Sequence, residues 1–187
     1  MRIFLAVDLN ETLRTGIAAV QRVLSREGIA GVRWADPAGI HLTLRFCGEI
    51  SRETVQRLIQ ALAPSAPHAP FPIRLGGLGT FPPKGSPRVL YLAVMEPGSL
   101  GPLAAWAEQR VVSAGLSREA RPFHPHLTLG RFRPGARPVS RGILDLPEAG
   151  ELGTLSVERI ILFESHLGPG GARYEALQSI PLEGTAK

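Results

Sequence analysis

The tetrapeptide His-Leu-Thr-Leu occurs twice in this chain, at residues 41–44 and 126–129. In an extended strand alternate side chains project from opposite faces, so each histidine shares a face with the threonine two residues later. The two leucines of each copy share the other face, where they can pack in a hydrophobic core while histidine and threonine line a polar cleft. One copy lies in each half of the chain. We therefore expect two imidazoles and two hydroxyls to meet at one site.

These side chains are the ones that cleavage of a phosphodiester needs. The reaction requires a base to activate the nucleophile, an acid to protonate the leaving oxygen, and donors for the nonbridging phosphate oxygens. Because the attacking and leaving oxygens lie on opposite sides of phosphorus, imidazoles from opposing parts of the fold suit it. Histidine, with an unperturbed pKa of about 6.5, can take either role. We predict that His41 and His126 are catalytic, that Thr43 and Thr128 bind the phosphate, and that no metal and no cofactor is required.

Two other kinds of site remain open at this stage. His124 and His126 alternate along one predicted strand and can approach a single cation, but a third ligand and a supporting carboxylate are not evident. Cys47, the only cysteine, lies in an apolar stretch. A small buried hydrophobic residue is the favoured interpretation over a nucleophile.

The composition is that of a globular chain, and its positive charge either favours a polyanionic partner or serves solubility. Of the 187 residues 44% are hydrophobic and 20% charged, and Lys plus Arg exceed Asp plus Glu by 21 to 16, for a net charge of +5. Charge alone does not distinguish RNA from other anions. A single cysteine allows no intrachain disulfide, and no stretch has the form of a signal peptide or a membrane span. We expect a cytoplasmic protein that does not enter the membrane.

Strands and helices are predicted in both halves of the chain. Residues 2–9 form a strand and Asn10 caps a helix whose apolar positions are spaced by three and four residues, which leaves Arg14, Gln21 and Arg22 mostly outside. Ser51 caps a second helix that ends before Pro64, and a third helix covers residues 99–114. The further strands are predicted at residues 71–78, 88–94, 126–132, 157–163 and 174–180. This order predicts an α+β fold with largely antiparallel sheets, and residues 1–187 are expected to form a single bilobal domain.

At these motifs the sequence resembles the RNA 2′,3′-cyclic phosphodiesterases of the 2H phosphoesterase superfamily, also called the 2′-5′ RNA ligase family. The paired His-x-Thr-x motifs are the specific part, and the resemblance covers nearly the whole chain. The segments that carry it are residues 2–7, 41–49, 87–91, 121–131, 163–167 and 173–174.

The resemblance implies two pseudo-symmetric lobes around a basic cleft, and hydrolysis of a terminal RNA 2′,3′-cyclic phosphate to a 2′-phosphate. It makes His41 the proton donor to the departing 3′ oxygen and His126 the base that activates water. It also implies reversible 2′-5′ joining of RNA ends without a nucleotide cofactor. Cys47 and Tyr91 depart from the residues common in relatives, leucine and tryptophan, and neither is expected to touch the chemistry.

Residues beside the motifs are candidates for substrate binding. Phe46 and Phe132 either stack on a base or enter the core, and the core is favoured. Arg131 and Arg45 are candidate phosphate contacts, although Arg131 can instead brace the motif through a carboxylate. Arg88 and Lys84 are weaker candidates of the same kind.

A different class of function uses the same basic cleft. The alternative is an RNA-binding module with little or no turnover, which predicts salt-sensitive binding without a product. The matched histidine and threonine pairs favour the enzyme, because binding alone needs no acid and base. We expect a monomer whose partner is RNA with 2′,3′-cyclic phosphate ends.

Overall fold

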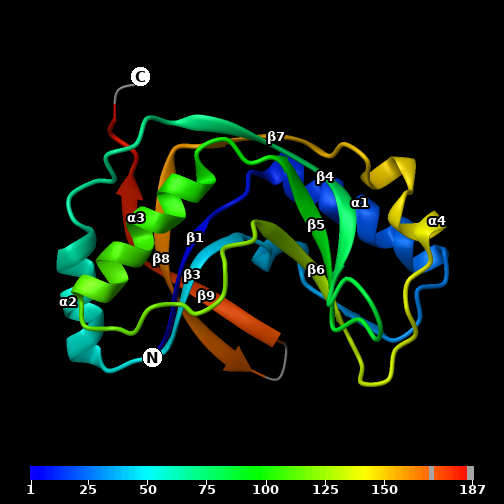
Figure 1. Ribbon diagram of the computed structural model, residues 1–187, viewed down its shortest axis with the longest axis horizontal. Coiled ribbons are helices and arrows are strands. Elements are labelled where there is room, and N and C mark those ends of the chain that lie inside the picture. Colours follow the sequence, from blue (N-terminus) through cyan, green and yellow to red (C-terminus); the bar gives the residue numbers. More distant parts are fainter. Residues whose placement is uncertain (169–170, 185–187) are drawn as a thin grey trace.

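The computed structural model describes residues 1–168 and 171–184, which form one large sheet and a few helices (Figure 1). The strands are β1 (Arg2–Val7), β2 (Val32–Trp34), β3 (Leu42–Glu49), β4 (Phe71–Phe81), β5 (Val89–Glu96), β6 (His126–Phe132), β7 (Gly153–Val157), β8 (Arg159–Gly168) and β9 (Gly171–Pro181). The α-helices are α1 (Glu11–Arg26), α2 (Arg52–Leu62), α3 (Leu100–Ser113) and the short α4 (Arg141–Leu144), and two 3₁₀ turns, η1 (Pro37–Gly39) and η2 (Pro147–Ala149), complete the set.

The sheet runs in the order β7-β4-β5-β6-β3-β1-β8-β9, with β2 pairing to β6 outside this path. All pairings between these strands of the described chain are antiparallel. The predicted α+β class and the antiparallel sheet are therefore confirmed. The sheet is strongly curved and passes without a break from one half of the fold to the other (Figure 1).

The helices begin where the sequence predicted caps. The Asn10 side chain accepts a hydrogen bond from the backbone N–H of Leu13 at 2.9 Å, and that of Ser51 accepts one from Thr54 N–H at 3.2 Å. Such bonds satisfy N–H groups that have no partner within the helix. The apolar positions of α1 predicted to face inward, Leu13, Ile17, Val20 and Leu24, are all buried.

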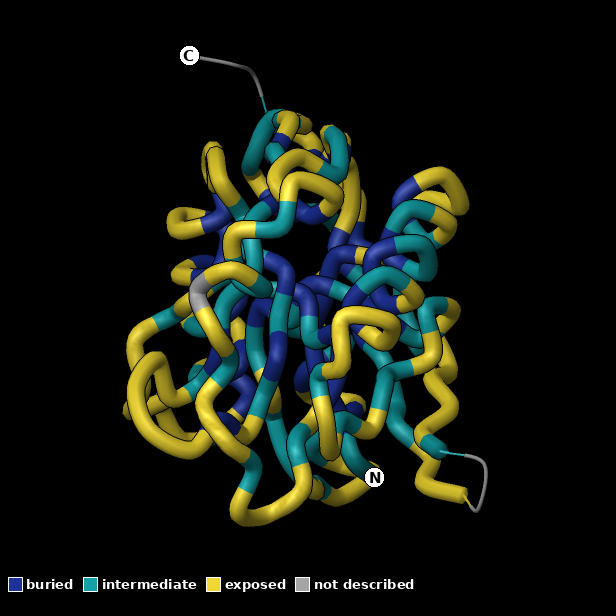
Figure 2. The backbone as a smooth tube through the Cα atoms, turned by 90° about the vertical axis from the view of Figure 1, so that its right-hand side faces the viewer, coloured by how far each residue is buried: buried dark blue, intermediate teal, exposed yellow. Residues whose placement is uncertain are grey.

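Helices cover the sheet on the side that holds the core. α2 and α3 pack against each other beside β3, while α1 lies behind β4, β5 and β6 (Figure 1). The buried residues run through the strands in the middle of the molecule and the exposed ones gather in the loops (Figure 2). The apolar face of β3, Leu42 and Leu44, and that of β6, Leu127 and Leu129, belong to this core. No helix of the described chain combines the length and apolar character needed to cross a membrane.

The elements expected from the sequence differ from the structure at three places. β2 and β7 were not predicted, because strands of three and five residues are too short for a clear alternation. The predicted strand from Val157 to Phe163 is instead the end of β7 and the start of β8. Arg14 and Gln21 were expected outside, but the Arg14 side chain is 12% exposed and Gln21 is 8% exposed.

Candidate active site

The two motifs meet where β3 and β6 pair. The register joins Leu42 to Leu127, the second residue of each copy, so an antiparallel ladder at this point sets each histidine near the threonine of the other copy. His41, Thr43, His126 and Thr128 all line one cleft of about 680 Å³. The predicted division of each motif into a cleft face and a core face is confirmed, since the leucines are buried and the other four side chains border the cleft.

The fourth residue of each motif, Leu44 in β3 and Leu129 in β6, forms a bulge in its strand. Along β1, Leu5 pairs with Arg45 and Ala6 with Thr43, so Leu44 has no partner. Along β5, Leu90 pairs with Gly130 and Tyr91 with Thr128, so Leu129 is skipped in the same way. An extra residue in one strand interrupts the strict alternation of faces. The residue three positions after each threonine therefore faces the cleft, and these residues are Phe46 and Arg131.

The bulges explain which substrate-binding predictions fail. Arg45 was a candidate phosphate contact, but it does not border the cleft and instead pairs with Glu108 of α3 and donates to the Ser117 carbonyl. Phe46 was favoured for the core, but it is 40% exposed and lines the cleft, whereas Phe132 packs against the core. Arg131 lines the cleft as predicted, and within the described residues it has no carboxylate partner. Lys84 and Arg88 do not border the cleft.

Both imidazoles are held in the same way. Nδ1 of His41 lies 2.8 Å from the Gly39 carbonyl oxygen, and Nδ1 of His126 lies 2.8 Å from the His124 carbonyl oxygen. A carbonyl oxygen only accepts hydrogen bonds, so Nδ1 carries the proton in each ring. Nε2 is then the atom of each histidine that remains to exchange protons in the cleft.

Aromatic rings surround each histidine. Phe4 stacks on His41 with 4.6 Å between ring centroids, and Tyr174 meets the same imidazole edge-on at 5.0 Å. Phe81 and Tyr91 approach His126 at 5.0 and 5.5 Å. Tyr91 does not border the cleft, as expected, but its ring supports that of His126. These rings pack against both imidazoles and shield part of each from water.

Burial lowers the pKa of both histidines. Desolvation is the largest cause in each case, because it disfavours the charged imidazolium. The charges around them differ. Asp8 raises the pKa of His41 while Arg14 and His126 lower it, whereas both charges that act on His126, those of His124 and Arg131, lower its pKa. His41 is thus the imidazole with an anion beside it.

The walls of the cleft carry more positive than negative side chains. Among the described residues, Arg2, Arg33 and Arg131 border it together with one carboxylate, that of Asp36. Arg2 also lies over the ring of Phe46, 5.2 Å from its centroid. Arg33 and its neighbour Trp34 belong to β2, and sequence reasoning missed them because this strand was not predicted. The cleft suits an anionic ligand with an aromatic part.

The residues that can bind a metal lie elsewhere. In the described chain Glu164, His166 and Glu175 bring three donor atoms within 4.8 Å of one another, on the β8–β9 hairpin, where Nε2 of His166 lies 3.8 Å from the Glu164 carboxylate and 3.2 Å from that of Glu175. His124 and His126, considered from the sequence, have ring centroids 6.3 Å apart and do not belong to such a group. Burial raises the pKa of the Cys47 thiol to about 11, which agrees with the prediction of an unreactive, packed cysteine.

Two histidines and two threonines that face one basic cleft are the groups that phosphoester chemistry needs. Residues 7–91 match the family model described as LigT like Phosphoesterase. A protein of Archaeoglobus fulgidus named RNA 2′,3′-cyclic phosphodiesterase is 33% identical over 95% of this chain and 98% of its own length. One of the same name from Methanothermobacter thermautotrophicus is 31% identical over 95% of this chain and 97% of its own. The chain belongs to the LigT-like phosphoesterase family, together with these RNA 2′,3′-cyclic phosphodiesterases, as the sequence predicted.

Solved structures agree with this assignment. The crystal structure of TT0787 of Thermus thermophilus has a TM-score of 0.81 and 31% identity, covering 100% of both chains. The structure of E. coli LigT complexed with 3′-AMP has a TM-score of 0.79 and 27% identity, covering 97% of each chain. The fold that positions the two motifs is thus shared with solved members of the family.

Proposed function

We propose that this protein hydrolyses terminal RNA 2′,3′-cyclic phosphates to 2′-phosphates by acid-base catalysis with His41 and His126. The observation that carries the proposal is the matched pair of imidazoles, each with Nδ1 bound to a carbonyl and Nε2 left for the cleft. Arg2, Arg33 and Arg131 favour an anionic substrate there. The relatives' name supplies the substrate class.

The proposed reaction assigns one proton transfer to each histidine. His126 Nε2 takes a proton from water as the water oxygen attacks phosphorus. The bond from phosphorus to the 3′ oxygen breaks, and His41 donates a proton to that oxygen, which leaves a 3′ hydroxyl and a 2′-phosphate. Asp8 supports the acid role of His41, because its charge opposes the lowering of the pKa of that imidazole by burial, Arg14 and His126. A negatively charged phosphate in the cleft also favours the protonated form of His41.

The remaining side chains hold the substrate in this proposal. Thr43 and Thr128 donate to the nonbridging oxygens, Arg131 neutralises phosphate charge, and the exposed ring of Phe46 stacks on a base. The two motif strands, with bulges at equivalent residues, support two pseudo-symmetric lobes on either side of the cleft. Attack by a 5′ hydroxyl of RNA in place of water gives the 2′-5′ linkage that the family resemblance implies.

The test is to incubate the purified protein with an RNA oligonucleotide ending in a 2′,3′-cyclic phosphate, in excess EDTA, and to identify the position of the phosphate in the product. A 2′-phosphate that disappears in His41→Ala and in His126→Ala, and persists in the control His68→Ala, supports the proposal; the His68 side chain lies outside the cleft. Salt-sensitive RNA binding by the folded wild-type protein without any product favours the binding module instead. Full activity of both His variants contradicts the two-histidine mechanism.

A further inference from the structure

Helix α1 carries two polar side chains that point into the protein. Arg14 and Gln21 lie seven residues apart, which is about two helical turns, so they share one face. The Arg14 side chain is 12% exposed and Gln21 is 8% exposed. Buried donors need acceptors, and both residues find them on backbone carbonyls next to the two motifs.

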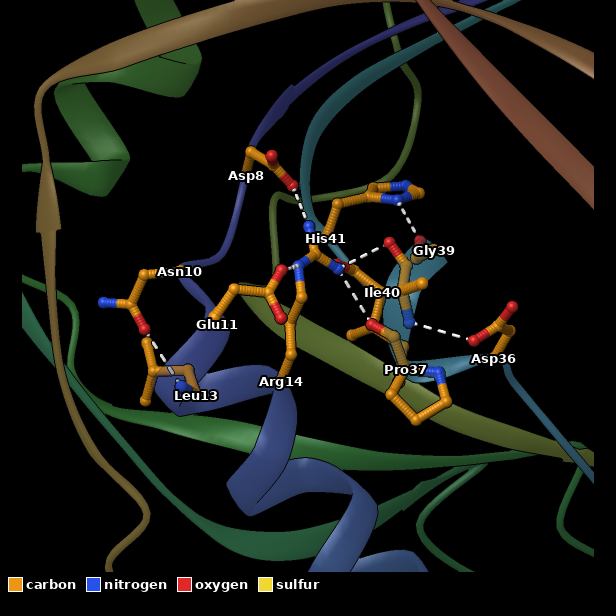
Figure 3. A network of polar contacts seen from close by, with 11 residues as sticks. Asp8, Asn10, Glu11, Leu13, Arg14, Asp36, Pro37, Gly39, Ile40 and His41 are labelled. Carbon is orange, nitrogen blue, oxygen red and sulfur yellow. Dashed lines mark hydrogen bonds and ion pairs between the residues drawn. The ribbon is translucent and has the colours of Figure 1, made fainter.

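Arg14 holds the turn that leads into the first motif (Figure 3). Its Nη2 pairs with Asp8, just after β1. Its Nη1 donates to three backbone carbonyls, those of Pro37 at 2.8 Å, Ala38 at 2.6 Å and Ile40 at 3.2 Å. These residues enclose Gly39, whose carbonyl accepts the Nδ1–H of His41. One guanidinium thus fixes the turn on both sides of the group that sets the tautomer of His41.

Gln21 holds the second motif. Its amide Nε2 donates to the Ala35 carbonyl at 2.8 Å and to the Leu129 carbonyl at 2.9 Å. Leu129 is the bulged residue of β6, directly after Thr128, and its carbonyl also accepts from the backbone N–H of Ala35. The same helix therefore binds the approach to His41 and the strand of His126.

We propose that α1 positions the two catalytic histidines relative to each other, with Arg14 and Gln21 as positioning residues for His41 and His126. Neither residue lines the cleft, so each acts through the backbone that it holds. The proposal rests on the two-histidine function proposed above. His126 has no arginine clamp like that of His41 among the described contacts, and Pro125 precedes it instead.

Four charged or titratable groups of the described chain face His41. Asp8 follows β1, Arg14 lies on α1, His126 lies on β6, and Tyr174 of β9 meets the imidazole edge-on. Asp8 raises the pKa of His41, whereas Arg14 and His126 lower it. Removing the Arg14 charge therefore raises the pKa of His41, and removing the Asp8 charge lowers it. These shifts follow from charge alone, so the tautomer of His41 and the loss of kcat that Arg14→Lys does not restore are what report positioning by Arg14.

The experiment compares Arg14→Met, Arg14→Lys, Gln21→Met and Asp8→Asn with a matched control, Arg22→Met, which removes an exposed arginine from the same helix. Turnover of the cyclic-phosphate RNA is measured together with the ring ¹⁵N resonances of the histidines across pH. A displacement of catalytic groups by about 1 Å can cost about 10²-fold in rate, so we expect kcat to fall at least about 10-fold in Arg14→Met with KM little changed. Gln21→Met lowers kcat but leaves the pKa of His41 unchanged.

Arg14→Lys separates charge from geometry. Lysine keeps the positive charge but lacks the planar fork that spans several carbonyls, so it retains the wild-type pKa of His41 while kcat stays reduced. In Arg14→Met the fraction of His41 with its proton on Nδ1 falls and its pKa rises, and in Asp8→Asn the pKa falls.

The proposal is overturned if Arg14→Met and Gln21→Met both keep the kcat of Arg22→Met, or if the tautomer of His41 does not change in Arg14→Met. The NMR measurement does not need turnover. If wild-type protein fails to cleave the RNA, the proposed function fails on that result alone, and the resonances of His41 still decide whether α1 positions it. Thermal unfolding shows whether Arg14→Met is folded. If it is not, the kcat values of Arg14→Lys and Gln21→Met test the proposal in its place.

Discussion

Gly79 of β4 leaves room for the ring of Tyr91, which in turn forms a wall beside His126. A methyl group at this glycine would lie 2.4 Å from Cζ and Oη of Tyr91, where ordinary van der Waals contact begins at 3.4 Å. The ring must then move by about 1 Å, the difference between these two distances. Tyr91 stacks on Phe81 at 4.4 Å, and both rings contact His126. Gly79→Ala therefore disturbs the support of a histidine without touching the cleft.

The expected loss follows from this displacement. Overpacking a tightly filled site costs about 1–3 kcal/mol of stability. A shift of about 1 Å in the supporting rings, passed on in part to the imidazole, predicts a fall in kcat between about 10- and 100-fold. KM should stay near its wild-type value, because neither Gly79 nor Tyr91 lines the cleft.

Steady-state kinetics on the cyclic-phosphate RNA test this reasoning in a double-mutant cycle. Tyr91→Leu removes the ring that clashes, so Gly79→Ala should add almost no further loss of kcat in that background. The reasoning is refuted if folded Gly79→Ala keeps wild-type kcat, or if it causes the same loss with Tyr91 absent.

Further predictions concern stability, pH, metal and phosphate binding. Arg45→Met breaks a largely buried ion pair, in which the side chains of Arg45 and Glu108 are 9% and 21% exposed. Urea unfolding should show a loss of about 2–3 kcal/mol of stability, less than for a fully buried pair, while kcat stays unchanged. Burial lowers the pKa of His41 and His126 in the folded state, so their contribution to the free energy of unfolding is fully present above the unfolded pKa of about 6.5 and declines as pH falls toward the folded pKa. A denaturation midpoint at pH 5 equal to that at pH 7.5 would contradict this. Excess EDTA should leave turnover unchanged, and a loss restored by added metal would instead favour a metal site. Thr43→Val should lower kcat/KM about 10-fold, the loss of about 1.5 kcal/mol for a hydrogen bond to a charged phosphate, and an unchanged value would remove Thr43 from phosphate binding.

Local sequence patterns predicted the elements and the faces of the motif strands. A cap at Asn10 and apolar residues spaced by three and four predicted α1, because capping and helical periodicity depend on neighbouring residues alone. Alternation within each His-Leu-Thr-Leu copy predicted which side chains enter the core and which enter the cleft, because the period of two holds within a short strand.

Where that local rule was interrupted, the prediction failed. The bulge at Leu44 turns Arg45 toward Glu108 and brings Phe46 to the cleft, and a bulge appears only when a second strand supplies the register. The buried Arg14 and Gln21 were misplaced for a related reason. Their side chains donate to backbone carbonyls that are distant in sequence, up to 108 residues away for Gln21. No pattern in the residues around Arg14 or Gln21 indicates such a partner.

The sequence alone was therefore sufficient to propose which residues do the chemistry, since two identical tetrapeptides already contain an acid, a base and donors for the phosphate. The tertiary structure decided how these residues are held: the pairing of Leu42 with Leu127, the aromatic walls around each imidazole, and the two side chains of α1 that anchor both motifs. Residue type and spacing are local properties of the chain. Register, burial and the partners of buried polar groups arise only when distant segments come into contact.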